Sequence, residues 1–136
     1  MIEDLTLDLK RDEGFRQHPY KDSVGIWTVG YGRNLEDVGI REKEAEVLLQ
    51  NDIMHVLSEM EREWIWLEDV PNDVHRGLAN MAFNLGMPRL KGFKKMLDAL
   101  CVLDFNKAAD EALDSKWAKQ VGRRADRIAE LFRNSV

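Results

Sequence analysis

Apolar residues recur at steps of three and four along most of the chain, and this spacing predicts a mainly helical protein. The first stripe predicts a helix over residues 2–12 that Gly14 ends. A longer stripe predicts a helix of about six turns from residue 41 to residue 64. Its members are Ala45, Leu48, Leu49, Ile53, Val56, Leu57, Met60 and Trp64. These two stripes lie on either side of a segment with a different period.

Further helices are expected after residue 66. Pro71 marks a break, Asn72 is a candidate N-cap, and Gly86 ends a helix that we expect to be buried and central. Its expected apolar face consists of Val74, Leu78, Met81, Ala82 and Leu85. Three more helices are expected over about 92–100, 104–115 and 123–134.

The segment between the first two helices has the alternating period of a strand. Residues 22–25, Asp-Ser-Val-Gly, form a turn-rich tetrapeptide. In residues 26–31, Ile26, Thr28 and Gly30 alternate with Trp27, Val29 and Tyr31, as on the two faces of a strand. A β-hairpin is therefore expected. Because no linker, repeat or low-complexity tract divides residues 1–136, we expect a single domain. Its hairpin lobe is expected over about 14–40 and its helical lobe over 1–13 and 41–136.

Composition and charge exclude several classes of function. The 136 residues are 44% hydrophobic and 33% charged, which is typical of an ordinary soluble domain, and the net charge of −5 argues against nucleic acid as the main partner. The acidic first residues differ from a secretory signal, and no apolar run approaches the length of a membrane span. We therefore expect synthesis in a cytoplasm without a signal peptide, and no stable membrane association.

The cysteine and histidine positions do not predict a metal site. Cys101 is the only cysteine and is expected to be a buried free thiol. The three histidines, at positions 18, 55 and 75, are too scattered for a metal site. We expect no metal and no cofactor.

The candidate chemistry lies around the hairpin. Glu13 ends the first helix, Asp22 stands in the turn and Thr28 lies on the returning strand, so three oxygen-bearing side chains are expected around one cleft. Glycoside hydrolysis uses one carboxylic acid to protonate the leaving oxygen and a second carboxylate at the anomeric centre or its water. Taken singly, each acid is equally typical of a solvated surface or of a local cap.

The spacing E-x8-D-x5-T, within "DEGFR", "YKD" and "GIWTVGYG", resembles that of the phage-type lysozymes of glycoside hydrolase family 24, which include the T-even phage lysozymes. "NMAFNLG" is similar to the central buried helix of that family, and "SKWAKQVGRRADR" to the segment that returns past its active site. The resemblance implies an α+β, predominantly helical lysozyme-like fold in which a hairpin lobe and a helical lobe flank a cleft.

The resemblance also implies residue roles. Glu13 becomes the proton donor, Asp22 the carboxylate across the cleft, and Thr28 the partner that holds the attacking water. The implied reaction is hydrolysis, with inversion, of the β-1,4 bond between N-acetylmuramic acid and N-acetylglucosamine of peptidoglycan. Three further residues are implied to line the sugar cleft: Trp27, Phe83 and Asn84. For Trp27 and Phe83, a role in packing alone stays open.

The resemblance implies supporting ion pairs as well, Arg124 with Glu13 and Arg127 with Asp12. Arg33 stands where many relatives have histidine, and by the same resemblance its partner is Asp52. The segment after "GYGRN" is shorter than in the T-even enzymes, so a smaller hairpin lobe is expected.

The implied protein is a monomer, an endolysin that a separate pore-forming protein releases to the cell wall.

Two alternatives from other classes stay open. A lytic transglycosylase on a similar scaffold needs the acid but no aspartate that directs water. A non-catalytic peptidoglycan-binding or helical interaction protein is expected to lack one of the three residues, whereas all three are present.

Overall fold

A computed structural model describes residues 1–135. The chain consists of two compact units, Met1–Leu48 and a helical unit that begins at Leu49. In the described part of the chain, no helix is long and apolar enough to cross a membrane. The predicted grouping of residues 1–13 with 41–136 in one lobe stays a prediction.

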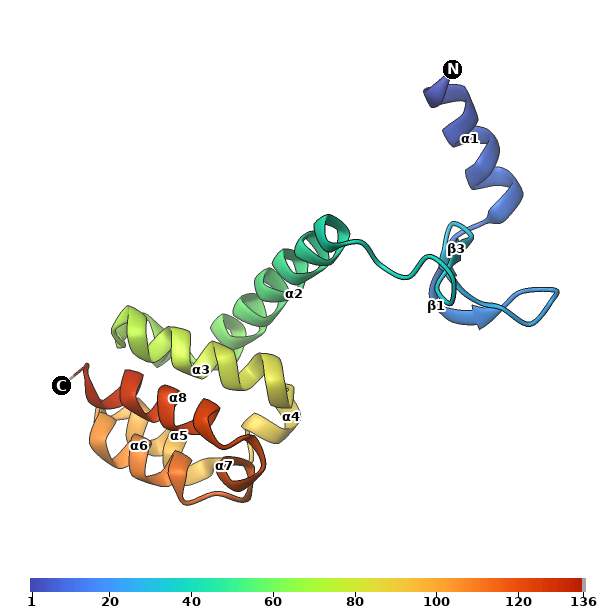
Figure 1. Ribbon diagram of the computed structural model, residues 1–136. Helices are drawn as coiled ribbons and strands as arrows, with labels where there is room; N and C mark the ends of the chain where they lie inside the picture. The colour runs from blue at the N-terminus through green and yellow to red at the C-terminus, as the bar shows by residue number, and fades with distance from the viewer. Residues whose placement is uncertain (136) are drawn as a thin grey trace. The chain divides into compact units, whose positions relative to one another are not determined.

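The first unit contains one helix and a small sheet. Helix α1, Ile2–Glu13, ends as predicted at Gly14, whose φ of 69° favours glycine and whose N–H donates to Lys10 O at 3.0 Å. An antiparallel sheet of order β1-β2-β3 follows (Figure 1). Its strands are β1, Arg16–Lys21; β2, Trp27–Gly30; and β3, Arg33–Asn34.

The register of the sheet places Thr28 at its centre. Thr28 is opposite Tyr20 on β1 and opposite Asn34 on β3, and it is 5% exposed. The predicted hairpin is therefore confirmed, with Lys21 opposite Trp27 across the turn. The third strand was not predicted because two residues are too few to show a period of two.

Helix α2, Glu42–Glu63, is the longest element, as predicted, and the boundary between the two units lies within it. Its C-terminal part buries Met60. The shorter elements of the helical unit follow in order: η1, Ile65–Asp69; α3, Asn72–Leu85; α4, Met87–Leu90; α5, Lys94–Cys101; α6, Phe105–Leu113; α7, Lys116–Val121; and α8, Arg123–Arg133. Caps from Asp104 and Ser115 begin α6 and α7.

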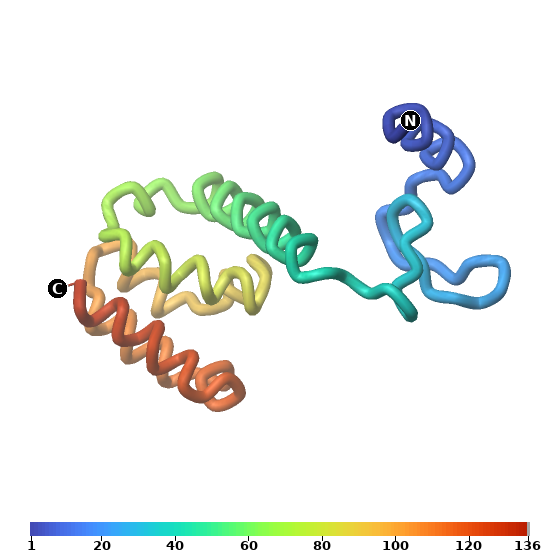
Figure 2. The backbone as a smooth tube through the Cα atoms, turned by 45° about the horizontal axis from the view of Figure 1, so that its top comes forward, coloured from blue at the N-terminus to red at the C-terminus, as the bar shows by residue number. Residues whose placement is uncertain are grey.

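The core of the helical unit forms where α3, α5, α6 and α8 pack together. Figures 1 and 2 show α3 and α8 side by side in both views. Gly77 on α3 permits this approach, because a Cβ there would lie 3.0 Å from Cε1 of Phe132 on α8. Val74, Leu78, Met81 and Ala82 are buried and Leu85 is half-buried, which confirms the predicted apolar face of α3.

Two local predictions are wrong. Asn72 is the first residue of α3, not its N-cap; the N-cap is Pro71, and no side chain caps the helix. Cys101 is an exposed free thiol. The buried residues of α5 are Met96, Ala99 and Leu100, and Cys101 lies about 100° further round the helix, away from that face.

Candidate active site

Glu13 is the last residue of α1 and is exposed. Gly14 stops the helix directly after it, so the side chain projects from a helix end. Its carboxyl lies against the backbone of Gly32, in the turn that joins β2 to β3. The position of Glu13 at a helix end was predicted correctly, whereas its contact with Gly32 was not predicted.

Asp22 lies in the turn before β2 and is half-buried. Its Oδ1 accepts hydrogen bonds from the backbone N–H groups of Val24 and Ile26, both at 2.9 Å. This is the local bonding that favours aspartate in turns. Among the hydrogen bonds and ion pairs of residues 1–135, none involves Oδ2, so one carboxylate oxygen holds the turn and the other is available for chemistry.

Thr28 is joined to Asp22 through Ile26. The Ile26 carbonyl accepts a hydrogen bond from Thr28 Oγ1 at 2.9 Å and another from Asp22 N at 2.9 Å. Because the Thr28 hydroxyl proton is used in this bond, the oxygen has only lone pairs to offer a further partner. A water bound there would donate to Thr28. The structure therefore brings Asp22 and Thr28 together, and it places Glu13 in the same unit.

Arg33 has an acidic partner that the sequence did not predict. Arg33 binds Glu44 in a bidentate ion pair, with NH1 donating to Oε1 at 2.9 Å and NH2 donating to Oε2, and NH1 also donates to Gly39 O at 3.0 Å. The hydrogen bond from Arg33 lowers the pKa of Glu44 to about 2, aided by the Arg41 N–H, and the pairing raises the pKa of Arg33. Asp52, the expected partner, belongs to the other unit, so a contact between Arg33 and Asp52 stays a prediction.

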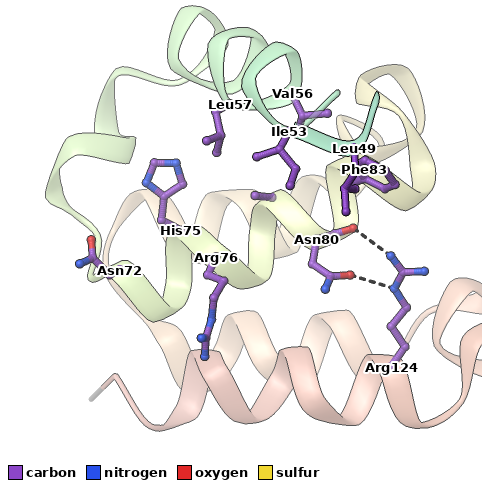
Figure 3. A pocket seen from close by; sticks show the side chains of 11 residues that line it. Leu49, Ile53, Val56, Leu57, Asn72, His75, Arg76, Asn80, Phe83 and Arg124 are labelled. Carbon is purple, nitrogen blue, oxygen red and sulfur yellow. Dashed lines mark hydrogen bonds between the residues drawn. The ribbon is translucent and has the colours of Figure 1, made fainter. Parts of the chain in front are cut away.

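The helical unit contains an apolar cavity of about 580 Å³ between α2 and α3 (Figure 3). Phe83, one of the predicted cleft residues, lines it and is 44% exposed. His75 also lines it, and its Nε2 is buried without a hydrogen-bond partner in residues 1–135. Five of the eleven lining side chains are aliphatic: Leu49, Ile53, Val56, Leu57 and Ala79.

Arg124 stands at the edge of this cavity. Its Nε donates to Asn80 Oδ1 at 2.8 Å and its NH2 reaches Asn80 O at 3.5 Å, as the dashed lines of Figure 3 show. Arg127 is exposed on α8, and Asp12 forms an ion pair with its neighbour Arg11 at 3.1 Å. The pairs of Arg124 with Glu13 and of Arg127 with Asp12 stay predictions.

The other two predicted cleft residues are exposed side chains with defined neighbours. Asn84 Oδ1 accepts a hydrogen bond from Trp117 Nε1 at 2.8 Å, which leaves its amide N–H₂ as the group available to a ligand. Trp27 is 43% exposed, and Lys21 Nζ lies 5.3 Å from its ring centroid, within range of a cation–π contact. Sugar binding by these residues stays a prediction.

No group of three or more histidine, cysteine or acidic residues is arranged to hold a metal ion anywhere in residues 1–135. The carboxyl groups of Glu13 and Asp22 are suited to proton transfer, and the Thr28 hydroxyl is suited to orienting water.

Comparison with known proteins shows that the chain is similar to lysozymes and to phage proteins. The chain is 26% identical over 162 aligned positions to "Probable T4-type lysozyme 2" of Dictyostelium discoideum, an alignment that covers 97% of this chain and 95% of that protein. It is 28% identical over 157 positions to the pre-baseplate central spike protein Gp5 of Enterobacteria phage T4, covering 91% of this chain and 26% of that protein. A SAR-endolysin of Bacteriophage PS34 is 33% identical over 78 positions, 54% of this chain and 46% of that protein.

The sequence profile of the phage lysozyme family matches residues 10–133, a span that includes Glu13, Asp22 and Thr28. With nearly the whole described chain covered, this protein belongs to the phage lysozyme family.

Proposed function

We propose that this protein is an endolysin-type lysozyme that hydrolyses the β-1,4 bond between N-acetylmuramic acid and N-acetylglucosamine in peptidoglycan by inversion. Membership of the phage lysozyme family supports the class of activity. The observation that carries the mechanism is the arrangement around Ile26: Asp22 keeps Oδ2 free, and Thr28 keeps only lone pairs free.

In the proposed reaction, Glu13 donates its proton to the glycosidic oxygen as the bond to the anomeric carbon breaks. A water donates one hydrogen bond to Thr28 Oγ1 and the other to Asp22 Oδ2. As the water oxygen attacks the anomeric carbon, Asp22 accepts its proton. The products are a new reducing end and a free hydroxyl on the leaving sugar, and exchange with solvent returns both carboxyl groups to their starting states.

The positions of the two carboxyl groups along the sheet support inversion. Asp22 precedes β2, whereas Gly32, against which Glu13 rests, follows β2. Inverting glycosidases hold their two carboxyl groups about 6.5–9.5 Å apart to admit a water, and retaining ones about 5–5.5 Å. Anchor points beyond opposite ends of a strand argue against the shorter separation.

Loss of turbidity of permeabilised Gram-negative cells tests the activity, with Glu13→Gln as the matched control. We expect lysis by the wild type, none above background by Glu13→Gln, and products that end in reducing N-acetylmuramic acid by mass spectrometry. Reducing N-acetylglucosamine ends would assign a different bond, and full activity of Glu13→Gln would remove the proposed acid.

A further inference from the structure

The turn that joins β2 to β3 contacts the end of α1 on both sides of Glu13. The ring of Tyr31 lies 5.5 Å from that of Phe15, with 50° between the two planes, and Lys10 Nζ lies 5.4 Å from the Tyr31 centroid. Lys10 precedes Glu13 by one helical turn, and Phe15 follows it by two residues. One aromatic ring therefore contacts the chain before and after the proposed acid.

Gly32, the next residue, is in contact with Glu13 itself. A Cβ at position 32 would lie 2.7 Å from Glu13 Oε2, 2.8 Å from Cδ and 3.1 Å from Cγ. Real Cβ atoms essentially never lie within 3.0 Å of another atom, so the Glu13 carboxyl, at the end of a flexible side chain, would have to move. The carboxyl of Glu13 therefore rests on a backbone surface that any side chain at position 32 would fill.

We propose that Tyr31 and Gly32 are positioning residues for the acid: Tyr31 holds the end of α1, and Gly32 provides the surface against which the Glu13 carboxyl lies. This inference rests on the proposed role of Glu13. It assigns to these two residues an effect on the rate of the chemical step, because a displacement of about 1 Å from the reactive geometry costs about 100-fold in rate.

Gly30 provides a matched control for Gly32. Its φ is 67°, against 73° for Gly32, so alanine introduces similar backbone strain at either position. A Cβ at Gly30, however, would have no atom within 4 Å. Only Gly32→Ala displaces the Glu13 carboxyl.

The kinetic test compares these two variants on soluble glycan strands. We expect Gly32→Ala to lower kcat about 100-fold with little change in KM, and to shift the pH–activity curve. Gly30→Ala should change kcat by no more than about 3-fold and should shift the pH–activity curve by no more than about 0.3 pH unit. Tyr31→Ala should lower kcat and Tyr31→Phe should restore it, since the ring makes both contacts. Equal losses from Gly32→Ala and Gly30→Ala would overturn the inference.

A second measurement tests the contact independently of activity. Urea midpoints are determined for Gly32→Ala and Gly30→Ala, each with Glu13 present and with Glu13→Ala. We expect removal of the Glu13 side chain to restore part of the midpoint lost in Gly32→Ala and none of that lost in Gly30→Ala. Equal midpoint losses in both backgrounds would show that the carboxyl moves aside without cost, and would refute Gly32 as a surface that positions it. Failure of the proposed function would instead appear as full activity of Glu13→Gln, whatever the midpoints.

Discussion

Substitutions of Asp22 can separate its structural role, in which Oδ1 holds the turn, from its proposed chemical role, in which Oδ2 accepts a proton. Asp22 Oδ1 accepts from two backbone N–H groups, whereas Oδ2 accepts from none of the described residues. Asparagine can place its carbonyl oxygen at Oδ1 and keep both bonds, but it has an N–H₂ in place of Oδ2 and cannot accept a proton from water. Alanine at position 22 loses both backbone hydrogen bonds and the proton acceptor.

The expected magnitudes follow from these bonds. A hydrogen bond to a charged group contributes about 1.5–3 kcal/mol and a neutral one about 0.5–1.5 kcal/mol. After the same allowance for partial exposure of the turn, Asp22→Asn, which weakens two bonds, lowers the free energy of unfolding by about 2 kcal/mol, and Asp22→Ala, which removes them, by about 3 kcal/mol. Removal of the base should lower kcat about 10²–10⁴-fold in both variants.

The assay combines urea unfolding with the rate of lysis of permeabilised cells. We expect Asp22→Asn to remain folded and to lose at least about 100-fold in rate, and Asp22→Ala to be the less stable of the two while being equally inactive. An Asp22→Asn variant with wild-type rate would refute the role of Oδ2. Equal stability of the two variants would refute the structural role of Oδ1.

Three other predictions address single side chains. Thr28→Ser keeps the hydroxyl and should retain most of kcat, whereas Thr28→Val should lower kcat about 100-fold. Each substitution should lower the free energy of unfolding by only about 1 kcal/mol, and equal rates of the two variants would refute the water-holding role. Because the pKa of Glu44 is lowered to about 2 from an ordinary 4.5, the stability from its pair with Arg33 is complete above pH 4.5 and lost as pH falls towards 2. Melting temperatures should therefore fall more steeply over this range in wild type than in Glu44→Gln, and equal slopes would contradict the pair. Cys101 should react with a thiol reagent in the native protein at nearly the rate of a free thiol, and protection until unfolding would contradict its exposure.

Long periodic elements were predictable from the sequence. The stripe from residue 41 to residue 64 predicted α2, observed over Glu42–Glu63, because a pattern repeated over six turns is hard to mistake for another structure. Gly14 and Gly86 marked helix ends correctly, and both have a positive φ. The strands β1 and β2 followed from the turn-rich tetrapeptide between them.

Short elements and side-chain partners could not be predicted. Helix α4 has four residues and β3 has two, too few for a period to be visible. The pairing of Arg33 with Glu44 was not predicted, because Glu44 is held in place by a hydrogen bond from Arg41 N at 2.9 Å, and this bond depends on how the chain enters α2. The contact of Glu13 with Gly32 likewise depends on folding, although the two glycines of "GYG" are the signal that could have indicated it.

The anomeric configuration of the first product tests the central claim most directly. Proton NMR of freshly cleaved glycan should show α-configured reducing ends, because a water held by Asp22 and Thr28 attacks the face opposite the departing sugar. Reducing ends that are initially β would contradict this account by requiring a covalent intermediate on Asp22, and 1,6-anhydro ends would contradict it by showing a transglycosylase that uses no water.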